Sequence, residues 1–221
     1  MESLHTKLLP YKELVGGIAS VVTIAQFFSG AVMCKDIHNR KTTKGVSAIP
    51  FVGAVIIGIL VFKYGLLLHD DAMLRVNMAS VSLNLCYVAV FLYYCENTWE
   101  DVFKPASYGI VLVALLLGYA EWEMPEKIEY RYGLLVTILQ LLLLASPLRD
   151  LANIIATKDA SSIPFPIAFM AAIVTFLWFI YSIILNNIFM LVQNFVGFVL
   201  CIVQISLVLM YGSHLEEGTT S

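Results

Sequence analysis

Between Ala160 and Leu215 the chain contains no Asp, Glu, Lys or Arg. An apolar stretch longer than about 20 residues indicates a membrane-spanning segment. Of the 221 residues, 60% are hydrophobic and 13% are charged, whereas soluble domains have about 25% charged residues. We therefore expect most of the chain to lie in a lipid bilayer.

Charged residues divide the remainder of the chain into further apolar segments. Crossing a bilayer takes about 20 residues of helix, because each residue adds about 1.5 Å to a path of about 30 Å. The segments are 14–33, 46–62, 76–95, 105–120 and 132–148. The uncharged run adds two more, with Asn186-Asn187 as the turn between them. Seven helical spans predict an all-α membrane protein, since a helix satisfies its own backbone in lipid.

The sequence T-K-x-x-S-x-I-P-F occurs twice, at residues 43–51 and again 114 residues later at 157–165. An internal repeat of this length predicts a duplicated helix bundle. Beyond the paired prolines the offset grows to 117, which pairs Tyr64 with Tyr181, Asn77 with Asn194 and Tyr94 with Tyr211.

The repeat covers spans one to three and spans five to seven, and span four has no counterpart. A single span between two three-helix units inverts the entry of the second unit, so both repeats run in the same direction. This predicts a 3+1+3 architecture. Its expected parts are an extracellular N-terminus 1–13, a first repeat 14–95, a linker helix with its loops 96–127, a second repeat 128–211 and a cytoplasmic tail 212–221.

The loop after span one indicates the orientation. It holds four basic residues, and basic loops are typically cytoplasmic. These residues are Lys35, Arg40, Lys41 and Lys44. Seven spans then place the N-terminus outside and the C-terminus inside. The plasma membrane is the expected compartment, with the Golgi or another endomembrane as the alternative.

Asn77 and Asn194 are polar residues within apolar segments, where polar groups most often serve function. In parallel repeats they would face each other across the pseudo-two-fold axis. A side-chain amide donates and accepts hydrogen bonds, as the hydroxyls of a sugar or polyol require. The alternative role is a hydrogen bond to a neighbouring helix, which a single membrane asparagine commonly makes.

Trp178 lies one helical turn before Tyr181 and could pack its ring against the C–H face of a sugar. The alternative is an anchor at the membrane interface, where tryptophan is common. Val61 occupies the matching position in the first repeat. We expect the two to line one binding pocket.

Prolines and polar helix ends suggest two gates. Pro50 and Pro164 open spans two and six, and Pro147 lies late in span five, where it permits a kink. We expect these prolines to form an inner hinge; the alternative is that Pro50 and Pro164 are plain helix starts. At the opposite ends of the helices, the expected outer-gate residues are Tyr64, Tyr181, Asp70 and Asn187.

Missing features exclude several functions. The span interiors carry no Asp, Glu or His, so a proton relay lacks its parts and passive movement of a solute is favoured. The sequence has no hydrolase, phosphate-loop or zinc motif, so an enzyme is the least supported class. Because metal-ligand spacing is missing, we also expect no metal or other cofactor. The net charge of only −3 gives no reason to expect a nucleic-acid partner. A seven-helix receptor and a non-transporting trafficking or scaffold protein remain alternatives, although a receptor has no reason to repeat three helices.

The chain resembles the SWEET (saliva/nodulin-type) sugar transporters. The resemblance rests on the 3+1+3 spans, the repeated T-K-x-x-S-x-I-P-F, the segment Ser146-Pro147-Leu148-Arg149-Asp150-Leu151 and an asparagine in spans three and seven. SWEETs are themselves known examples of parallel-repeat transporters. The short tail resembles that of animal members.

The resemblance implies bidirectional, facilitated transport of mono- or disaccharides such as glucose by alternating access, and it implies homo-oligomers. It assigns sugar binding to Asn77, Asn194, Trp178 and Val61. It assigns the inner gate to four positions, namely Pro50, Pro147, Pro164 and Gly30. At Gly30 this chain has glycine where the family pattern has proline, so the hinge there is expected to be weaker.

Overall fold

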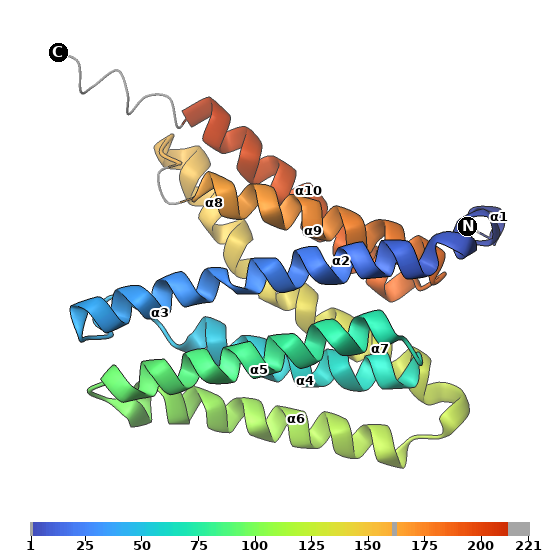
Figure 1. Cartoon of the computed structure of the whole chain (residues 1–221), viewed down its shortest axis with the longest axis horizontal. Helices are drawn as coiled ribbons and strands as arrows, with labels where there is room; N and C mark the ends of the chain where they lie inside the picture. Colours follow the sequence, from blue (N-terminus) through green and yellow to red (C-terminus); the bar gives the residue numbers. More distant parts are fainter. Residues whose placement is uncertain (1, 161–162, 212–221) are drawn as a thin grey trace. The chain divides into compact units, whose positions relative to one another are not determined.

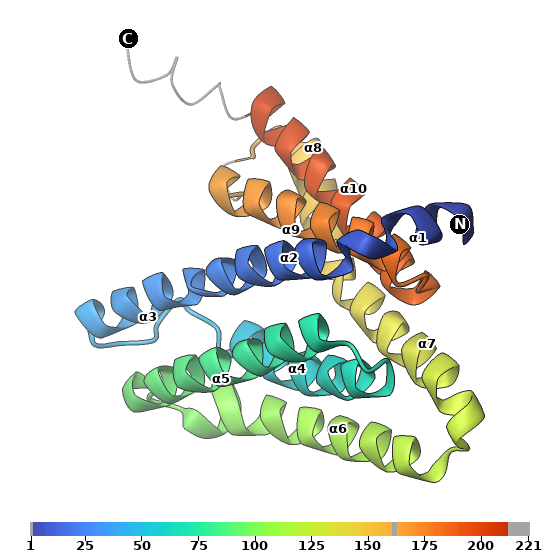
Figure 2. The same ribbon diagram turned by 45° about the vertical axis from the view of Figure 1, so that its right-hand side comes forward.

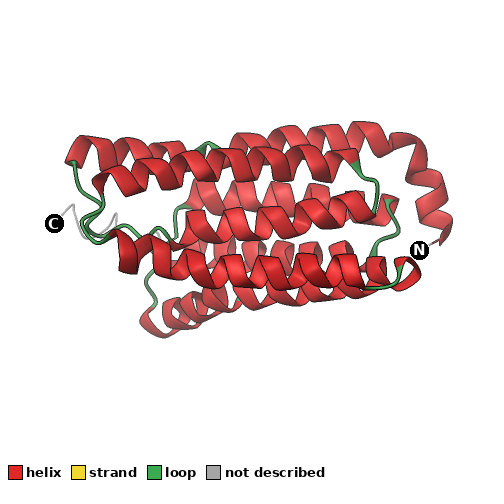
Figure 3. Ribbon diagram, turned by 90° about the horizontal axis from the view of Figure 1, so that it is seen from below, coloured by secondary structure: helices red, strands yellow, loops and turns green. Residues whose placement is uncertain are grey.

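The computed structural model describes residues 2–160 and 163–211, without the side chains of residues 2–4, 145–147, 149 and 150. The described residues form helices and turns and contain no strand, as Figure 3 shows. The first part of the chain comprises α1 (Glu2–Leu8), the 3-10 turn η1 (Leu9–Tyr11), α2 (Lys12–Phe27), α3 (Ser29–Arg40), α4 (Ile49–Leu67) and α5 (Asp71–Tyr94). It is followed by the π-helical turn η2 (Trp99–Phe103), α6 (Lys104–Trp122), α7 (Pro125–Leu143), α8 (Ala145–Thr157), α9 (Phe165–Ile184) and α10 (Ile188–Tyr211).

Six helical segments of the described chain are long and apolar enough to cross a membrane. They are His5–Arg40, Ile49–Leu67, Asp71–Tyr94, Trp99–Trp122, Phe165–Ile184 and Ile188–Tyr211. The predicted fifth span, 132–148, falls on α7 and the start of α8, which are separate helices. The predicted turn at Asn186-Asn187 is confirmed, because α9 ends at Ile184 and α10 begins at Ile188.

Helix packing follows the same order in both copies of the repeat (Figures 1 and 2). α5 packs against α3 and along α4, and α10 packs against α8 and along α9. The third helix of each copy is therefore in contact with the other two. The linker helix α6 packs on α4. The chain divides into two compact units, one of Met1–Ala19 with Thr137–Ser221 and one of Ser20–Val136.

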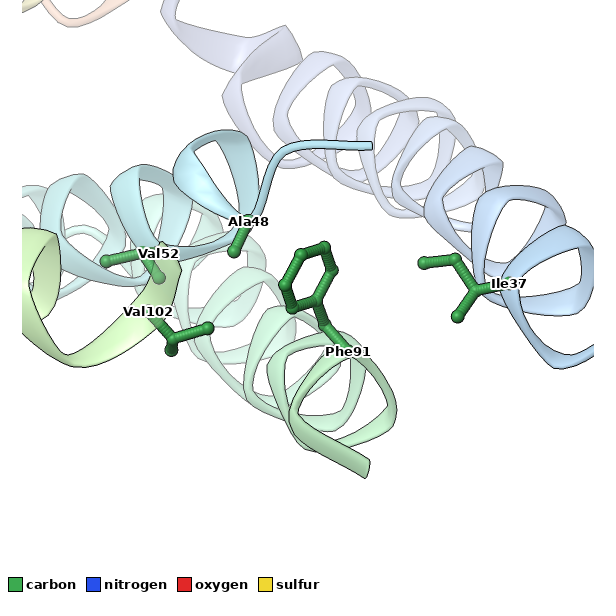
Figure 4. Close-up of a cluster of buried hydrophobic side chains, with 5 residues drawn as sticks. All are labelled: Ile37, Ala48, Val52, Phe91 and Val102. Carbon is green, nitrogen blue, oxygen red and sulfur yellow. The ribbon is translucent and has the colours of Figure 1, made fainter. Parts of the chain in front are cut away.

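A cluster of buried apolar side chains joins four elements of the Ser20–Val136 unit (Figure 4). The ring of Phe91 on α5 lies between Ile37 of α3 and Ala48, which precedes α4. Val52 of α4 and Val102 of η2 complete it. Because close side-chain packing is what holds helices together in lipid, this cluster fixes the ends of α3, α4 and α5 to one another.

The first helix of each repeat is broken at an equivalent place. The first break lies at Phe28, whose N–H donates to the Ala25 carbonyl at 3.2 Å. The second lies at Leu144, whose N–H donates to the Leu141 carbonyl at 3.1 Å. Both bonds span three residues instead of four, which tightens the turn and separates α2 from α3 and α7 from α8.

The structure corrects the alignment of the two copies at the start of the repeated motif. Lys41 (φ 56°) ends α3 and Lys158 (φ 55°) ends α8, both in the left-handed conformation and 117 residues apart. The offset of 114 instead pairs Thr43, which lies in the loop after α3, with Thr157, the last residue of α8. The two motif copies therefore differ by about one helical turn in their placement.

Ion pairs fasten the linker helix at one end. Lys63 of α4, a lone charge within an apolar helix, binds Glu121 of α6 through Nζ and Oε1 at 2.6 Å. Glu123, just past α6, accepts hydrogen bonds from Tyr119 at 2.7 Å, the Met124 N–H at 2.9 Å and Arg131. These donors lower the pKa of the Glu123 carboxyl to about 2. Glu123 therefore stays ionised and holds the turn from α6 to α7.

Candidate functional site

The turns that lead into α5 and α10 have the same backbone structure. After α4, His69 adopts φ 51°, and the N–H groups of His69 and Asp70 donate to the carbonyls of Leu66 and Gly65 at 3.2 and 3.0 Å. After α9, Asn186 also adopts φ 51°, and the corresponding bonds run from Asn186 to Ile183 at 3.1 Å and from Asn187 to Ser182 at 3.0 Å. This is the Schellman arrangement, which ends a helix sharply and satisfies its last carbonyls.

The residue after each left-handed position caps the following helix. Asp70 Oδ1 accepts from the Met73 N–H at 3.0 Å, and Asn187 Oδ1 accepts from the Met190 N–H at 3.0 Å. Asp70 has no exposed surface. Asp and Asn are favoured N-caps because a short side-chain oxygen reaches the free N–H groups of the first turn. The two predicted outer-gate residues therefore have a clear structural role, and their gate role stays a prediction.

Each cap leads directly to one of the paired asparagines. Asn77 and Asn194 are the seventh residues of α5 and α10. Asn77 Nδ2 donates to the Met73 carbonyl at 2.8 Å, and Asn194 Nδ2 donates to the Met190 carbonyl at 2.8 Å. Both residues are half-buried. These bonds orient the two amides in the same way relative to their helices.

Trp178 and Val61 also occupy equivalent places, each the seventh residue from the end of its helix. Trp178 is 8% exposed and Val61 is 9% exposed. The Trp178 ring meets the Tyr181 ring edge-on at 5.4 Å. By contrast, Trp122 is 82% exposed, as expected for an interfacial anchor. The burial of Trp178 therefore disfavours the anchor alternative.

The two predicted outer-gate tyrosines are buried. Tyr181 packs on Trp178, and Tyr64 lies 6.4 Å from Tyr132, ring centre to ring centre. Tyr132 of α7 in turn donates its hydroxyl to the Leu60 carbonyl of α4 at 3.2 Å. Tyr64 and Tyr132 thus fix α7 to α4 within the Ser20–Val136 unit.

The predicted inner-hinge residues lie at helix ends and breaks. Gly30 is the second residue of α3, just past the break, and Pro147 is the third residue of α8, although its side chain lies outside the described residues. Pro50 is the second residue of α4, whereas Pro164 is the N-cap of α9. The second residue of α9 is Pro166, which sequence reasoning missed although it stands two residues after Pro164.

Sequence reasoning also missed the two methionines that join caps to asparagines. Met73 and Met190 act through their backbone, so their side-chain types carry no signal. The offset of 117 was the available signal, since it pairs Asp70 with Asn187 and both lie seven residues before the paired asparagines.

A pocket within the Ser20–Val136 unit is apolar. It has a volume of about 610 Å³ and lies between α4, α5 and α6, with walls that include Val55, Ile59 and Leu117. No polar side chain lines it, so it offers no partner for a sugar hydroxyl. The described residues also contain no group of His, Cys, Asp and Glu that could hold a metal ion.

The sequence profile of one family matches both repeats of the chain, at residues 13–99 and 131–215. The family, MtN3_slv, is described as "Sugar efflux transporter for intercellular exchange". The matched segments cover most of the chain. The protein belongs to this family.

Individual relatives agree with this membership. The chain is 28% identical over 208 residues to the sugar transporter SWEET1 of Drosophila pseudoobscura pseudoobscura, covering 93% of this chain and 92% of the relative. It is 26% identical over 190 residues to human sugar transporter SWEET1, covering 84% and 85%. A eukaryotic SWEET transporter solved at 3.7 Å superposes with a TM-score of 0.83 at 19% identity, covering 93% of this chain and 98% of the other. The likeness confirms the 3+1+3 all-α fold of this MtN3_slv family member.

Proposed function

We propose that this member of the MtN3_slv family transports a mono- or disaccharide across a membrane, down the concentration gradient of the sugar. The carrying observation is that both repeats match the family and that each places an asparagine on the same scaffold. In each copy one methionine of the first helical turn makes two bonds. Its N–H donates to the capping side chain, and its carbonyl accepts from the asparagine.

The sugar-binding residues in this proposal are Asn77, Asn194, Trp178 and Val61, two from each repeat. The oxygen and N–H groups of each amide suit the paired donor and acceptor groups of sugar hydroxyls. Trp178 offers a flat apolar ring for the C–H face of the sugar, and Val61 is a smaller apolar residue at the matching position of the other repeat. Alternating access would use the helix breaks at Phe28 and Leu144 and the helix starts at Pro50 and Pro164.

The deciding experiment is sugar flux into proteoliposomes that contain only the purified chain. We expect saturable uptake by the wild type. Asn77→Ala and Asn194→Ala should each lower uptake at least about tenfold, since a lost hydrogen bond to a buried polar group costs 1–3 kcal/mol. A receptor or a scaffold would show no uptake in this assay.

Asn84→Ala is the matched control for the asparagine variants. Asn84 lies on the same helix as Asn77 and makes the same kind of bond, from Nδ2 to the Ser80 carbonyl at 2.9 Å. Its counterpart in the second repeat is Cys201, so it has no paired amide. Uptake that falls equally in the Asn84 and Asn77 variants would remove the sugar-binding assignment and leave a packing role.

We further propose an extracellular N-terminus, a cytoplasmic C-terminus and a homo-oligomer in the plasma membrane. The orientation is supported by four basic residues, of which Lys35 and Arg40 lie in the second half of α3 and Lys41 and Lys44 in the loop after it. A protease site placed in the 41–48 loop should be cut only from the cytoplasmic side of sealed vesicles. Cleavage from the outer side would reverse the orientation.

A further inference from the structure

Gly30 lies in direct contact with the ring of Tyr87, a residue of α5. A Cβ atom at position 30 would lie 2.5 Å from Cε2 and 2.7 Å from Cδ2 of that ring, closer than side chains approach in proteins. Glycine therefore lets α3 and α5 come together at this point. The contact falls just past the break at Phe28.

The hydroxyl of Tyr87 forms a hydrogen bond at the break itself. In an unbroken helix the Phe27 carbonyl would accept from the Ala31 N–H, but Ala31 donates to the Phe28 carbonyl at 3.0 Å. The Phe27 carbonyl instead accepts from Tyr87 Oη at 3.1 Å. In lipid a carbonyl without a donor is costly, because no water is present to replace the missing bond. Tyr87 supplies the donor that the break removes.

Tyr87 is itself held firmly on both sides. It forms a buried cluster with Cys34 of α3 and Phe51 of α4, and the Phe51 and Tyr87 ring centres are 5.6 Å apart. One turn further along α5 lies Phe91, which packs against Ile37 as Figure 4 shows. The seam between α3 and α5 thus continues from the break to the end of α3.

The second repeat keeps its break by a different means. Position 147, the counterpart of Gly30 at the offset of 117, is proline, and position 204, the counterpart of Tyr87, is glutamine. Proline has no N–H and cannot donate within the helix, so its own chemistry favours a break beside it without help from another residue. Glycine imposes no such break.

We infer that Tyr87 is the positioning residue of the break between α2 and α3, where it takes over the role that Pro147 has in the other repeat. The inference rests on the proposed transport function, because it assigns Tyr87 to the movement of α3 during alternating access. The break between α7 and α8 is then permanent, because proline imposes it. The break between α2 and α3 depends on one hydrogen bond and one ring contact.

Tyr87→Phe tests the hydrogen bond alone, because it keeps the ring on Gly30. We expect sugar flux to fall roughly five- to tenfold at unchanged surface expression, the effect of one hydrogen bond. Tyr93→Phe is the control, since Tyr93 lies on the same helix and is 81% exposed. Equal flux in the Tyr87→Phe variant and the wild type would overturn the role of the hydroxyl.

Gly30→Ala tests the ring contact. The added methyl must displace Tyr87, so we expect flux to fall at least about tenfold. Gly17→Ala in α2 is the control, since nothing lies within 4 Å of the position of its Cβ. In the double variant Gly30→Ala/Tyr87→Ala the methyl has nothing to displace, and flux should match that of Tyr87→Ala alone. Losses that multiply would show that the two residues act independently.

Alkylation of Cys34 separates positioning from general stability. Cys34 is 8% exposed and packs against Tyr87, and changing Cys86, Cys95 and Cys201 to alanine leaves it as the one thiol that can react. We expect Tyr87→Phe to speed its reaction with N-ethylmaleimide roughly three- to tenfold, with a fall in melting temperature no larger than the few degrees that one hydrogen bond is worth. An unchanged rate would contradict the inference. This readout needs no sugar, so a wild type without flux would contradict the proposed function and leave the hinge test intact.

Discussion

Asp70 shows how a single residue can suggest two roles. Its position in the turn after α4 suggests a gate, whereas its contact shows an N-cap whose carboxylate is fully buried and bonded to the Met73 N–H. Asn187 makes the same contact with a neutral amide. Since an amide oxygen serves in one copy, the capping role does not need a negative charge.

Asp70→Asn should therefore keep both stability and sugar flux. Asp70→Ala should lose about 1 kcal/mol of stability, the usual value of an N-cap, which corresponds to a fall of about 2–4 °C in melting temperature for a chain of this size. Thermal unfolding in detergent and flux in proteoliposomes measure the two effects. If Asp70→Asn keeps the melting temperature but abolishes sugar flux, the gate needs the carboxylate.

The residues that could be predicted are those whose role follows from their own chemistry and register. Asn77 and Asn194 are candidates for sugar binding because amides in an apolar segment are conspicuous and recur at one offset, and that role stays a prediction. The capping roles and the Tyr87 contact could not be predicted. Both depend on the path of the backbone and on which helix lies opposite, and Tyr87 reads as one more aromatic residue in an apolar helix.

Among the elements, the linker helix α6 has the most specific attachment. A Cβ at Gly109 would overlap the Ile56 side chain, so glycine permits α6 to approach α4 closely. Toward the other end of the same interface, the Lys63 ammonium and the Glu121 carboxylate are 2.6 Å apart, with 21% of the Lys63 side chain exposed. In the sequence Lys63 only marks the end of the second apolar segment, 46–62. The structure explains it as half of an ion pair.

Lys63→Glu should destabilise the protein, because it places two carboxylates together at the end of α4. The exchange Lys63→Glu/Glu121→Lys should restore most of the melting temperature and the surface expression. Lys127→Glu, in the first turn of α7, is a control for the change in net charge. If the losses of melting temperature in Lys63→Glu and Glu121→Lys simply add in the exchanged chain, the two residues do not act as a pair.

Element boundaries were predictable to the extent that charge marks them. The bounds of α6, Lys104–Trp122, fall at the limits of the uncharged run between Lys104 and Glu121, whereas α4 continues past Lys63 to Leu67. The breaks at Phe28 and Leu144 have no such mark, because both are apolar residues in apolar surroundings. Pro147 gave a signal in the second repeat, and the glycine in the first repeat gave a weaker one.

At the scale of the whole molecule, the distribution of charge determines what can drive transport. α4, α9 and α10 contain no Asp or Glu, and in α5 and α6 the acidic residues are confined to the ends, at Asp71 and Glu121. Proton-coupled transporters carry an acidic residue or a histidine within the membrane to bind the proton. The described spans offer no such residue in their middle turns.

We therefore expect sugar flux that depends on the sugar gradient alone. Uptake into proteoliposomes should be the same with and without a proton or sodium gradient, and it should change little between pH 5 and pH 8. The Glu123 carboxyl does not titrate in that range, since its pKa is lowered to about 2. Its contribution to stability is present above the ordinary pKa of glutamate, about 4.3, and is lost only as the pH falls toward 2. Uptake that collapses when a protonophore is added would show coupling, and would require a proton-binding group that the charge distribution does not provide.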